Sequence, residues 1–160
     1  MGYEMAYAVF LSHNSRDGEW IKWIGGNAQS AGISVWLYEH DPRPGVLIAD
    51  KVKEKIRACD ALVVLLTENS RSSAYVQQEI GFAEACGKLI IPLVQPGIEP
   101  GALAMLEGRE WVEFDFKNPE RALAVLLDYL QRLKAAKETR QRAALVGFGT
   151  LLLVAFMLRE

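Results

Sequence analysis

Short apolar runs alternate with amphipathic stretches along most of the chain. The runs lie at residues 7–11, 33–37, 61–66, 89–94 and 111–114. Two of them, 61–66 and 89–94, carry no polar side chain, which is typical of strands buried on both faces of a parallel sheet. Between the runs, apolar residues recur at helical spacing over 17–31, 48–59, 74–86 and from 119 onward. The alternation predicts an α/β fold with an open, five-stranded parallel sheet.

The chain ends in an apolar segment of a different kind. Residues 143–158 carry no charge, and they raise the hydrophobic share of the 160-residue chain to 51%. A helix of this length spans about 24 Å, and the stems of Arg142 and Arg159 extend it to about 27 Å, close to the thickness of a bilayer core. Because every face is apolar, we expect a transmembrane helix. The alternative is a helix that packs on the domain or in an oligomer.

Charge divides the chain at the same place. Residues 1–133 carry 13 basic and 18 acidic side chains, a net charge of −5, whereas 134–142 carry four basic and one acidic, a net charge of +3. This balance does not favour nucleic-acid binding. Basic residues beside a membrane helix favour the cytoplasmic side. We therefore expect a domain over 7–134, a basic juxtamembrane segment over 135–142 and a membrane helix over 143–158, which would anchor the domain to the inner face of the cell membrane.

The motifs of common cofactor and metal sites are missing from the sequence. No glycine-rich phosphate-binding signature follows the first strand. The two histidines, His13 and His40, have no second ligand at metal spacing, and Cys59 and Cys86 do not form a CxxC pair. We expect neither a metal nor a bound cofactor.

Glu79 is the best catalytic candidate near the expected carboxyl ends of the strands, where open α/β sheets bind ligands. Tyr75 precedes it by four residues, so both share one helix face. A carboxylate beside an aromatic ring can hydrogen-bond ribose hydroxyls and balance an oxocarbenium-like charge while the ring stacks on a base. The alternative is a solvated carboxylate beside a core tyrosine.

Three segments, in this order, resemble those of the Toll/interleukin-1 receptor (TIR) domain in its bacterial form. Residues 8–13 are similar to the first family box, and 75–80 to the aromatic-x-x-x-Glu segment of members that cleave NAD+. The segment similar to the BB loop consists of Asp41, Pro42, Arg43, Pro44 and Gly45. His40 stands where this loop usually has arginine, and Tyr75 where many members have tryptophan. The resemblance covers about 7–134 and implies a flavodoxin-like, five-stranded parallel sheet.

The resemblance implies either cleavage of the nicotinamide–ribose bond of NAD+ or adaptor signalling through TIR–TIR contacts. Cleaving members carry a glutamate at the position of Glu79. We therefore expect an NAD+ glycohydrolase or ADP-ribosyl cyclase that uses NAD+ as substrate and needs no cofactor. The resemblance implies that Phe10 and Ser12 line a pocket for the nicotinamide-ribose part of NAD+. It also implies that Asp41 closes over this pocket and that Tyr75 supplies a stacking ring. The plainer roles are a core strand residue for Phe10 and a helix cap for Ser12.

The resemblance also implies partners, namely copies of the chain joined through the BB loop into homo-oligomers or filaments, in bacterial immune signalling or NAD depletion. Pro42 and Pro44 stiffen that loop and lower the ordering cost of docking. An ordinary rigid turn is the alternative. Two competing functions are a non-enzymatic interaction module and a glycosyltransferase of similar fold that acts on nucleosides.

Overall fold

The computed structural model describes residues 6–38, 44–45, 47–99 and 106–157. Its elements, in chain order, are β1 (Ala8–Ser12), η1 (Ser15–Asp17), α1 (Gly18–Ser30), β2 (Ser34–Trp36), α2 (Ile48–Ala58), β3 (Ala61–Leu66), α3 (Ala74–Ala85), β4 (Leu89–Val94), β5 (Val112–Glu113) and α4 (Pro119–Met157). Strands and helices alternate up to β4, as the hydrophobic pattern predicts, and β5 then follows β4 with no helix between them in the described residues. The two strands at the ends of the sheet are short, with three residues in β2 and two in β5.

The five strands form one sheet in the order β2-β1-β3-β4-β5, and all neighbouring strands are parallel. All six residues of β3, the central strand, are buried. The predicted flavodoxin-like, five-stranded parallel sheet is confirmed. The strand order reverses between β1 and β3, because the chain leaves β1 toward β2 and then returns across it to β3. Sheets of this kind bind ligands at such a switch point, outside the carboxyl ends of the strands.

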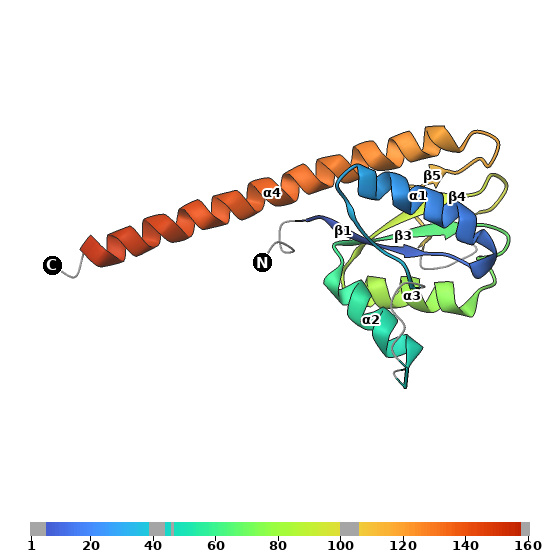
Figure 1. Ribbon diagram of the computed structural model, residues 1–160, viewed down its shortest axis with the longest axis horizontal. Coiled ribbons are helices and arrows are strands. Elements are labelled where there is room, and N and C mark those ends of the chain that lie inside the picture. The colour runs from blue at the N-terminus through green and yellow to red at the C-terminus, as the bar shows by residue number, and fades with distance from the viewer. Residues whose placement is uncertain (1–5, 39–43, 46, 100–105, 158–160) are drawn as a thin grey trace.

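Helices cover both faces of the sheet (Figure 1). Side chains alternate along β1, so Val9 and Leu11 pack on the face covered by α1 and α4, whereas Phe10 packs on the face covered by α2 and α3. Each face has its own cluster of buried residues, which extends from the strands into the flanking helices. The sheet thus holds α2 and α3 side by side on one face, next to the switch point.

A buried polar network joins the loops that follow β1 and β3. The carboxylate of Asp17 is 4% exposed and accepts hydrogen bonds from Thr67 Oγ1 at 2.7 Å and from Asn69 Nδ2 at 2.8 Å. The Ser70 hydroxyl donates to the Leu65 carbonyl at 2.9 Å. Because each of these buried polar groups has a partner, the two loops are held together at the carboxyl edge of the sheet.

Helix α4 begins on the sheet and continues far beyond it (Figure 1). Its 39 residues correspond to a length of about 58 Å. Ala122, Leu126 and Leu130 are buried against the sheet. The Lys137 ammonium then donates to Asp60 Oδ2 at 2.9 Å and to the Ala6 carbonyl at 2.9 Å. The helix therefore passes without interruption through residues 134 and 142, where the charge pattern had placed segment boundaries.

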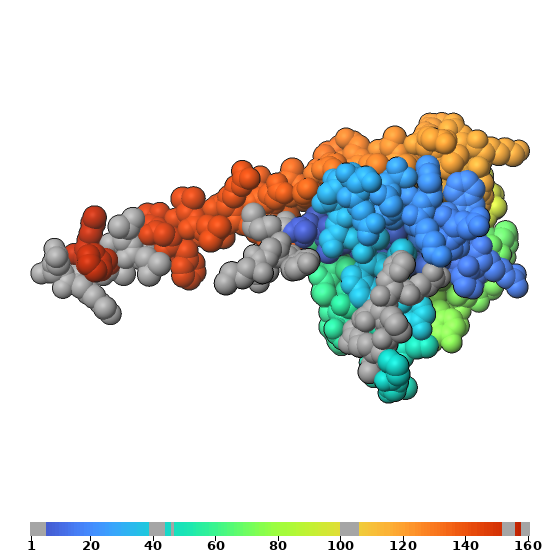
Figure 2. Space-filling view, in the orientation of Figure 1, coloured from blue at the N-terminus to red at the C-terminus, as the bar shows by residue number. Residues whose placement is uncertain are grey.

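The end of α4 projects from the domain (Figure 2). Leu145, Val146, Phe148 and Leu151 have exposed fractions between 69% and 72%. Within the described parts of the chain, no helix combines the length and apolar character needed to cross a membrane. The structure confirms a helix here but does not support the predicted transmembrane segment over 143–158.

Candidate active site

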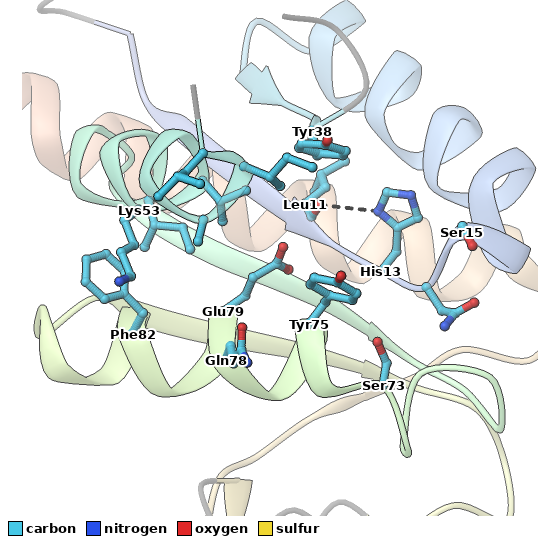
Figure 3. Close-up of a pocket in the computed structure, with 16 residues that line it drawn as sticks. Leu11, His13, Ser15, Tyr38, Lys53, Ser73, Tyr75, Gln78, Glu79 and Phe82 are labelled. Carbon is cyan, nitrogen blue, oxygen red and sulfur yellow. Dashed lines mark hydrogen bonds between the residues drawn. The ribbon is translucent and has the colours of Figure 1, made fainter. Parts of the chain in front are cut away.

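A pocket of about 570 Å³ opens between α2 and α3, beside the carboxyl end of β1 (Figure 3). This volume lies within the range typical of small-molecule sites. One wall is apolar and comes from the α2 region, where Ile48, Val52 and Ile56 line the pocket. The facing wall comes from α3 and contributes Tyr75, Gln78, Glu79 and Phe82. The pocket lies at the switch point of the sheet, as the topology predicts.

The local sequence places Glu79 on the pocket side of α3. Ser73 caps the helix, because its backbone is extended and its hydroxyl accepts a 3.5 Å hydrogen bond from the Val76 amide. Val76 and Ile80 are fully buried against the sheet. Glu79 adjoins this buried stripe and is itself partly buried, so it faces the space between α3 and α2 rather than bulk water.

Ser12 and Glu79 form the polar centre of the site. Ser12 is the last residue of β1 and is 1% exposed. Its hydroxyl donates a hydrogen bond to Glu79 Oε2. Burial raises the pKa of Glu79 from 4.5 to about 7, and the hydrogen bond from Ser12 opposes this rise by stabilising the carboxylate. A carboxyl group that titrates near neutral pH inside a pocket is typical of functional sites.

Aromatic side chains border the pocket on both sides of Glu79. Tyr75 and Tyr38 lie on one side, together with His13, while Phe82 and Lys53 lie on the other (Figure 3). Tyr75 is 74% exposed, so its ring is available to a ligand and does not belong to the core. His13 Nδ1 lies 3.5 Å from the Leu11 carbonyl oxygen.

The structure brings together three of the residues that the sequence singles out. Ser12 is not among the described residues that line the pocket, but its buried hydroxyl contacts Glu79 from behind the wall. Tyr75 lines the pocket one helical turn away from Glu79. Ser12 is not a helix cap, because the side chain that caps η1 is that of Asn14. Asp41 lies outside the described residues, as do Pro42 and Arg43 of the BB loop.

Phe10 does not line the pocket among the described residues, although the resemblance assigns it there. It is 1% exposed and stacks on Trp36, with ring centroids 6.5 Å apart and planes inclined by 10°. Phe10 packs on the α2–α3 face of the sheet, next in sequence to Leu11, which lines the pocket. The structure therefore places it in the hydrophobic core, as its plainer role predicts.

Phe82, Tyr38 and Lys53 are among the pocket residues that were not assigned to the site from the sequence. Phe82 follows Glu79 by three residues, and this spacing already places both on one helix face. Tyr38 lies two residues after the end of β2, at the edge of the sheet where sites occur. Lys53 had no such signal, because a lysine on the polar face of an amphipathic helix usually points only to solvent.

The described residues hold no group of three or more histidine, cysteine, aspartate or glutamate side chains arranged to bind a metal ion. The pocket lining offers one partly buried carboxyl group, one lysine, aromatic rings, the imidazole of His13 and several hydroxyl and amide groups.

The sequence model of the TIR domain matches residues 9–127, which is most of the folded domain. The chain belongs to the TIR domain family. No curated protein matches it. The match ends within α4, so the projecting end of this helix lies beyond the TIR match.

Solved structures of similar fold include other TIR domains. The TIR domain of the Toll-related receptor TRR-2 from Hydra magnipapillata superposes with a TM-score of 0.65 at 19% identity, covering 79% of this chain and 97% of that one. The TIR domains of the activated Roq1 resistosome, which recognises the pathogen effector XopQ, give 0.52 at 18% identity, covering 84% and 82%. A 2-desoxiribosyltransferase from Leishmania mexicana gives 0.54 at 16% identity, covering 76% and 97%. At these identities the likeness concerns the fold.

Proposed function

We propose that this TIR domain cleaves the nicotinamide–ribose bond of NAD+. The observation that carries the proposal is the carboxyl group of Glu79, partly buried in a 570 Å³ pocket and hydrogen-bonded by the buried hydroxyl of Ser12. Glu79 lies in the segment that resembles the aromatic-x-x-x-Glu motif of the family members that cleave NAD+. Self-association through the BB loop and a role in signalling or NAD depletion belong to the same proposal.

The Glu79 carboxylate stabilises the positive charge that develops on the ribose during cleavage. The bond between the anomeric carbon and the nicotinamide nitrogen breaks, and the electron pair leaves with neutral nicotinamide. A carboxylate near the anomeric carbon lowers the free energy of the oxocarbenium-like transition state. The Ser12 hydroxyl holds the carboxylate in one orientation, and the apolar wall of α2 reduces screening by water.

Water completes the reaction by attacking the anomeric carbon. Its oxygen forms the new bond to the ribose, and the released proton goes to Glu79 or to solvent, which gives ADP-ribose. A nucleophile of the same molecule gives a cyclic ADP-ribose isomer instead. The rings of Tyr75 and Tyr38 offer faces that attract the positively charged nicotinamide of the substrate before cleavage.

Release of nicotinamide from NAD+ by the purified full-length chain tests this function. Protein concentration is varied so that activity depending on self-association is detected. Glu79→Gln keeps the size of the side chain but removes the negative charge, and it should reduce turnover by at least about 100-fold. Glu84→Gln, on the exposed side of the same helix in a pair with Arg109, should retain turnover. Full turnover by the Glu79 variant would contradict the assigned role.

Two other functions make different predictions for the same assays. An interaction module would bind other TIR domains without loss of NAD+. A glycosyltransferase would act on nucleosides instead, and the shared fold with a 2-desoxiribosyltransferase favours this candidate. A panel of NAD+ and nucleosides, assayed alongside TIR–TIR binding, distinguishes the three functions.

The proposal extends to location, with the domain on the cytoplasmic side of a membrane and α4 as the attachment. The apolar side chains at the end of the helix are about 70% exposed, and four basic residues precede them. Flotation of the full-length chain with anionic liposomes tests this attachment. Replacing Leu145 and Phe148 by glutamate should abolish flotation, whereas Val125→Glu, on the domain part of α4, should not. Equal flotation of all variants would contradict attachment through this end.

A further inference from the structure

The pocket offers different chemistry in the two directions along α3 from Glu79. Tyr75 lies four residues before Glu79 and Phe82 three residues after it, which corresponds to about 6 Å and about 4.5 Å along the helix axis. Tyr75, Tyr38 and His13 lie on one side (Figure 3). Lys53 lies with Phe82 on the other side (Figure 3). A ligand whose ends differ in charge is therefore oriented by the pocket.

Lys53 supplies the positive charge of the pocket. Of the 16 described residues that line it, Lys53 is the one lysine or arginine. Its ammonium lies 5.8 Å from the centroid of the Phe82 ring, and the Arg57 guanidinium lies 4.9 Å from the same ring. The ring thus holds Lys53 at the pocket wall while the ammonium stays in contact with solvent.

In the described part of the chain, Lys53 forms no salt bridge with Glu79. Burial raises the pKa of the Glu79 carboxyl, and the hydrogen bond from Ser12 lowers it. The positive charge at one side of the pocket and the carboxyl at its centre are therefore separate groups that can act on different parts of one ligand.

We propose that Lys53 binds the diphosphate of NAD+ and thereby orients the dinucleotide with its nicotinamide toward Tyr75 and Tyr38. This inference rests on the proposed function. In NAD+ the nicotinamide ring is positive and the diphosphate is negative, and they lie on opposite sides of the ribose that reacts. With the anomeric carbon at Glu79, the reversed orientation places the positive ring next to the Lys53 ammonium and moves the diphosphate away from it, to the side of Tyr75, Tyr38 and His13.

The same contact gives the pocket a preference for dinucleotides over nucleosides. A lysine that contacts phosphate forms a charge-assisted hydrogen bond, and such bonds are stronger than those between neutral groups. A nucleoside such as nicotinamide riboside has the same reacting bond but no phosphate, so Lys53 adds nothing to its binding. The residue therefore acts on substrate affinity and not on the bond-breaking step.

Steady-state kinetics of the full-length chain with NAD+ and nicotinamide riboside test this assignment. Lys53→Met keeps most of the side-chain stem and removes the charge. It should raise KM for NAD+ about tenfold, change kcat less than about twofold, and leave both constants for nicotinamide riboside unchanged. Lys53→Arg should restore most of the affinity for NAD+. Lys55→Met is the matched control, because Lys55 lies on the same helix over the Trp36 ring and outside the described pocket lining.

Binding provides a measurement that does not depend on turnover. In the Glu79→Gln background, Lys53→Met should raise the Kd for NAD+ about tenfold in calorimetry, and Lys55→Met should leave it unchanged. An unchanged KM and Kd for NAD+ in the Lys53 variant would overturn the assignment, as would an equal loss for nicotinamide riboside. Failure of the wild-type chain to cleave NAD+ would instead refute the proposed function. If NAD+ then still binds, the effect of Lys53 on Kd still decides the assignment.

Discussion

The raised pKa of Glu79 makes the stability of the domain depend on pH. The ordinary carboxyl pKa of 4.5 applies to the unfolded chain, whereas burial raises the pKa of Glu79 to about 7 in the folded chain. Between these values the folded state binds the proton more tightly than the unfolded state. Below pH 4.5 Glu79 is protonated in both states and does not lower the free energy of unfolding. As the pH rises from 4.5 to about 7, ionisation increasingly favours the unfolded state, and above about pH 7 the loss of stability is complete. Glu79→Gln removes this cost, because glutamine does not ionise.

The size of the effect follows from the two pKa values. One pKa unit corresponds to about 1.4 kcal/mol. The change from 4.5 to about 7 therefore corresponds to a free energy on the order of 3 kcal/mol at full ionisation. The hydrogen bond from Ser12 remains in the variant, since the amide oxygen of glutamine accepts it as the carboxylate does.

Urea denaturation of the wild type and Glu79→Gln at several pH values measures this effect. At pH 4.5 the two free energies of unfolding should nearly agree. At pH 8 the variant should be more stable by about 3 kcal/mol, and most of that difference should appear between pH 5 and pH 7.

Glu113→Gln serves as the control, because Glu113 is exposed on the edge strand β5. Its effect on stability should be small at every pH. A difference between the wild type and Glu79→Gln that does not change with pH would refute the reasoning. It would mean that Glu79 ionises as easily in the folded chain as in the unfolded chain.

Three further predictions concern the pocket and α4. If the ionised form of Glu79 is active, kcat/KM for NAD+ should rise with pH through about 7, and Ser12→Ala should move this midpoint to higher pH because the hydrogen bond from Ser12 lowers the pKa. Tyr75→Ala should raise KM for NAD+ about fivefold, whereas Tyr75→Phe should keep KM near the wild-type value, since the ring face is retained. Lys137→Met should lower the free energy of unfolding in urea by about 1 kcal/mol, because it removes the charged donor to Asp60 Oδ2, which then keeps the hydrogen bond from the Ala8 amide.

Each of these three has an outcome that contradicts it. An unchanged pH profile in Ser12→Ala would show that the hydroxyl does not stabilise the carboxylate. Equal KM values for Tyr75→Ala and the wild type would show that the exposed ring does not contact the substrate. For Lys137, the comparison is Arg132→Met, which removes a solvent-exposed pair with Asp128 on the same helix and should leave the free energy of unfolding almost unchanged. An equal effect of the two substitutions would contradict a special role for the Lys137 contact.

The order and type of the elements were predictable because they depend on local pattern. The runs 61–66 and 89–94 form strands with the predicted bounds, since a segment without polar side chains is stable only when both faces are covered. The start of the last helix at Pro119 follows from Asn118 and from the proline in the first turn. Strands β2 and β5 are shorter than their apolar runs, because each pairs with a neighbour on one side only.

The role of each site residue was harder to predict, because exposure depends on packing between distant segments. Phe10 and Tyr75 are both aromatic residues in segments that resemble family motifs. The first is 1% exposed in the core and the second is 74% exposed at the pocket. The alternation along β1 turns Phe10 into the core between the sheet and α2 and α3, whereas the packing of α3 leaves Tyr75 at the pocket. Neither is contained in the motif alone.

The sequence by itself determined the elements, the parallel sheet and the helix face that carries Tyr75 and Glu79, because residues within one helix or strand have fixed relative positions. Only the tertiary structure brought Ser12 into contact with Glu79, 67 positions away, and placed Lys53 on the pocket wall. The pKa of Glu79 has the same origin. Desolvation by residues from separate helices and strands raises it, and no local pattern in the chain specifies that environment.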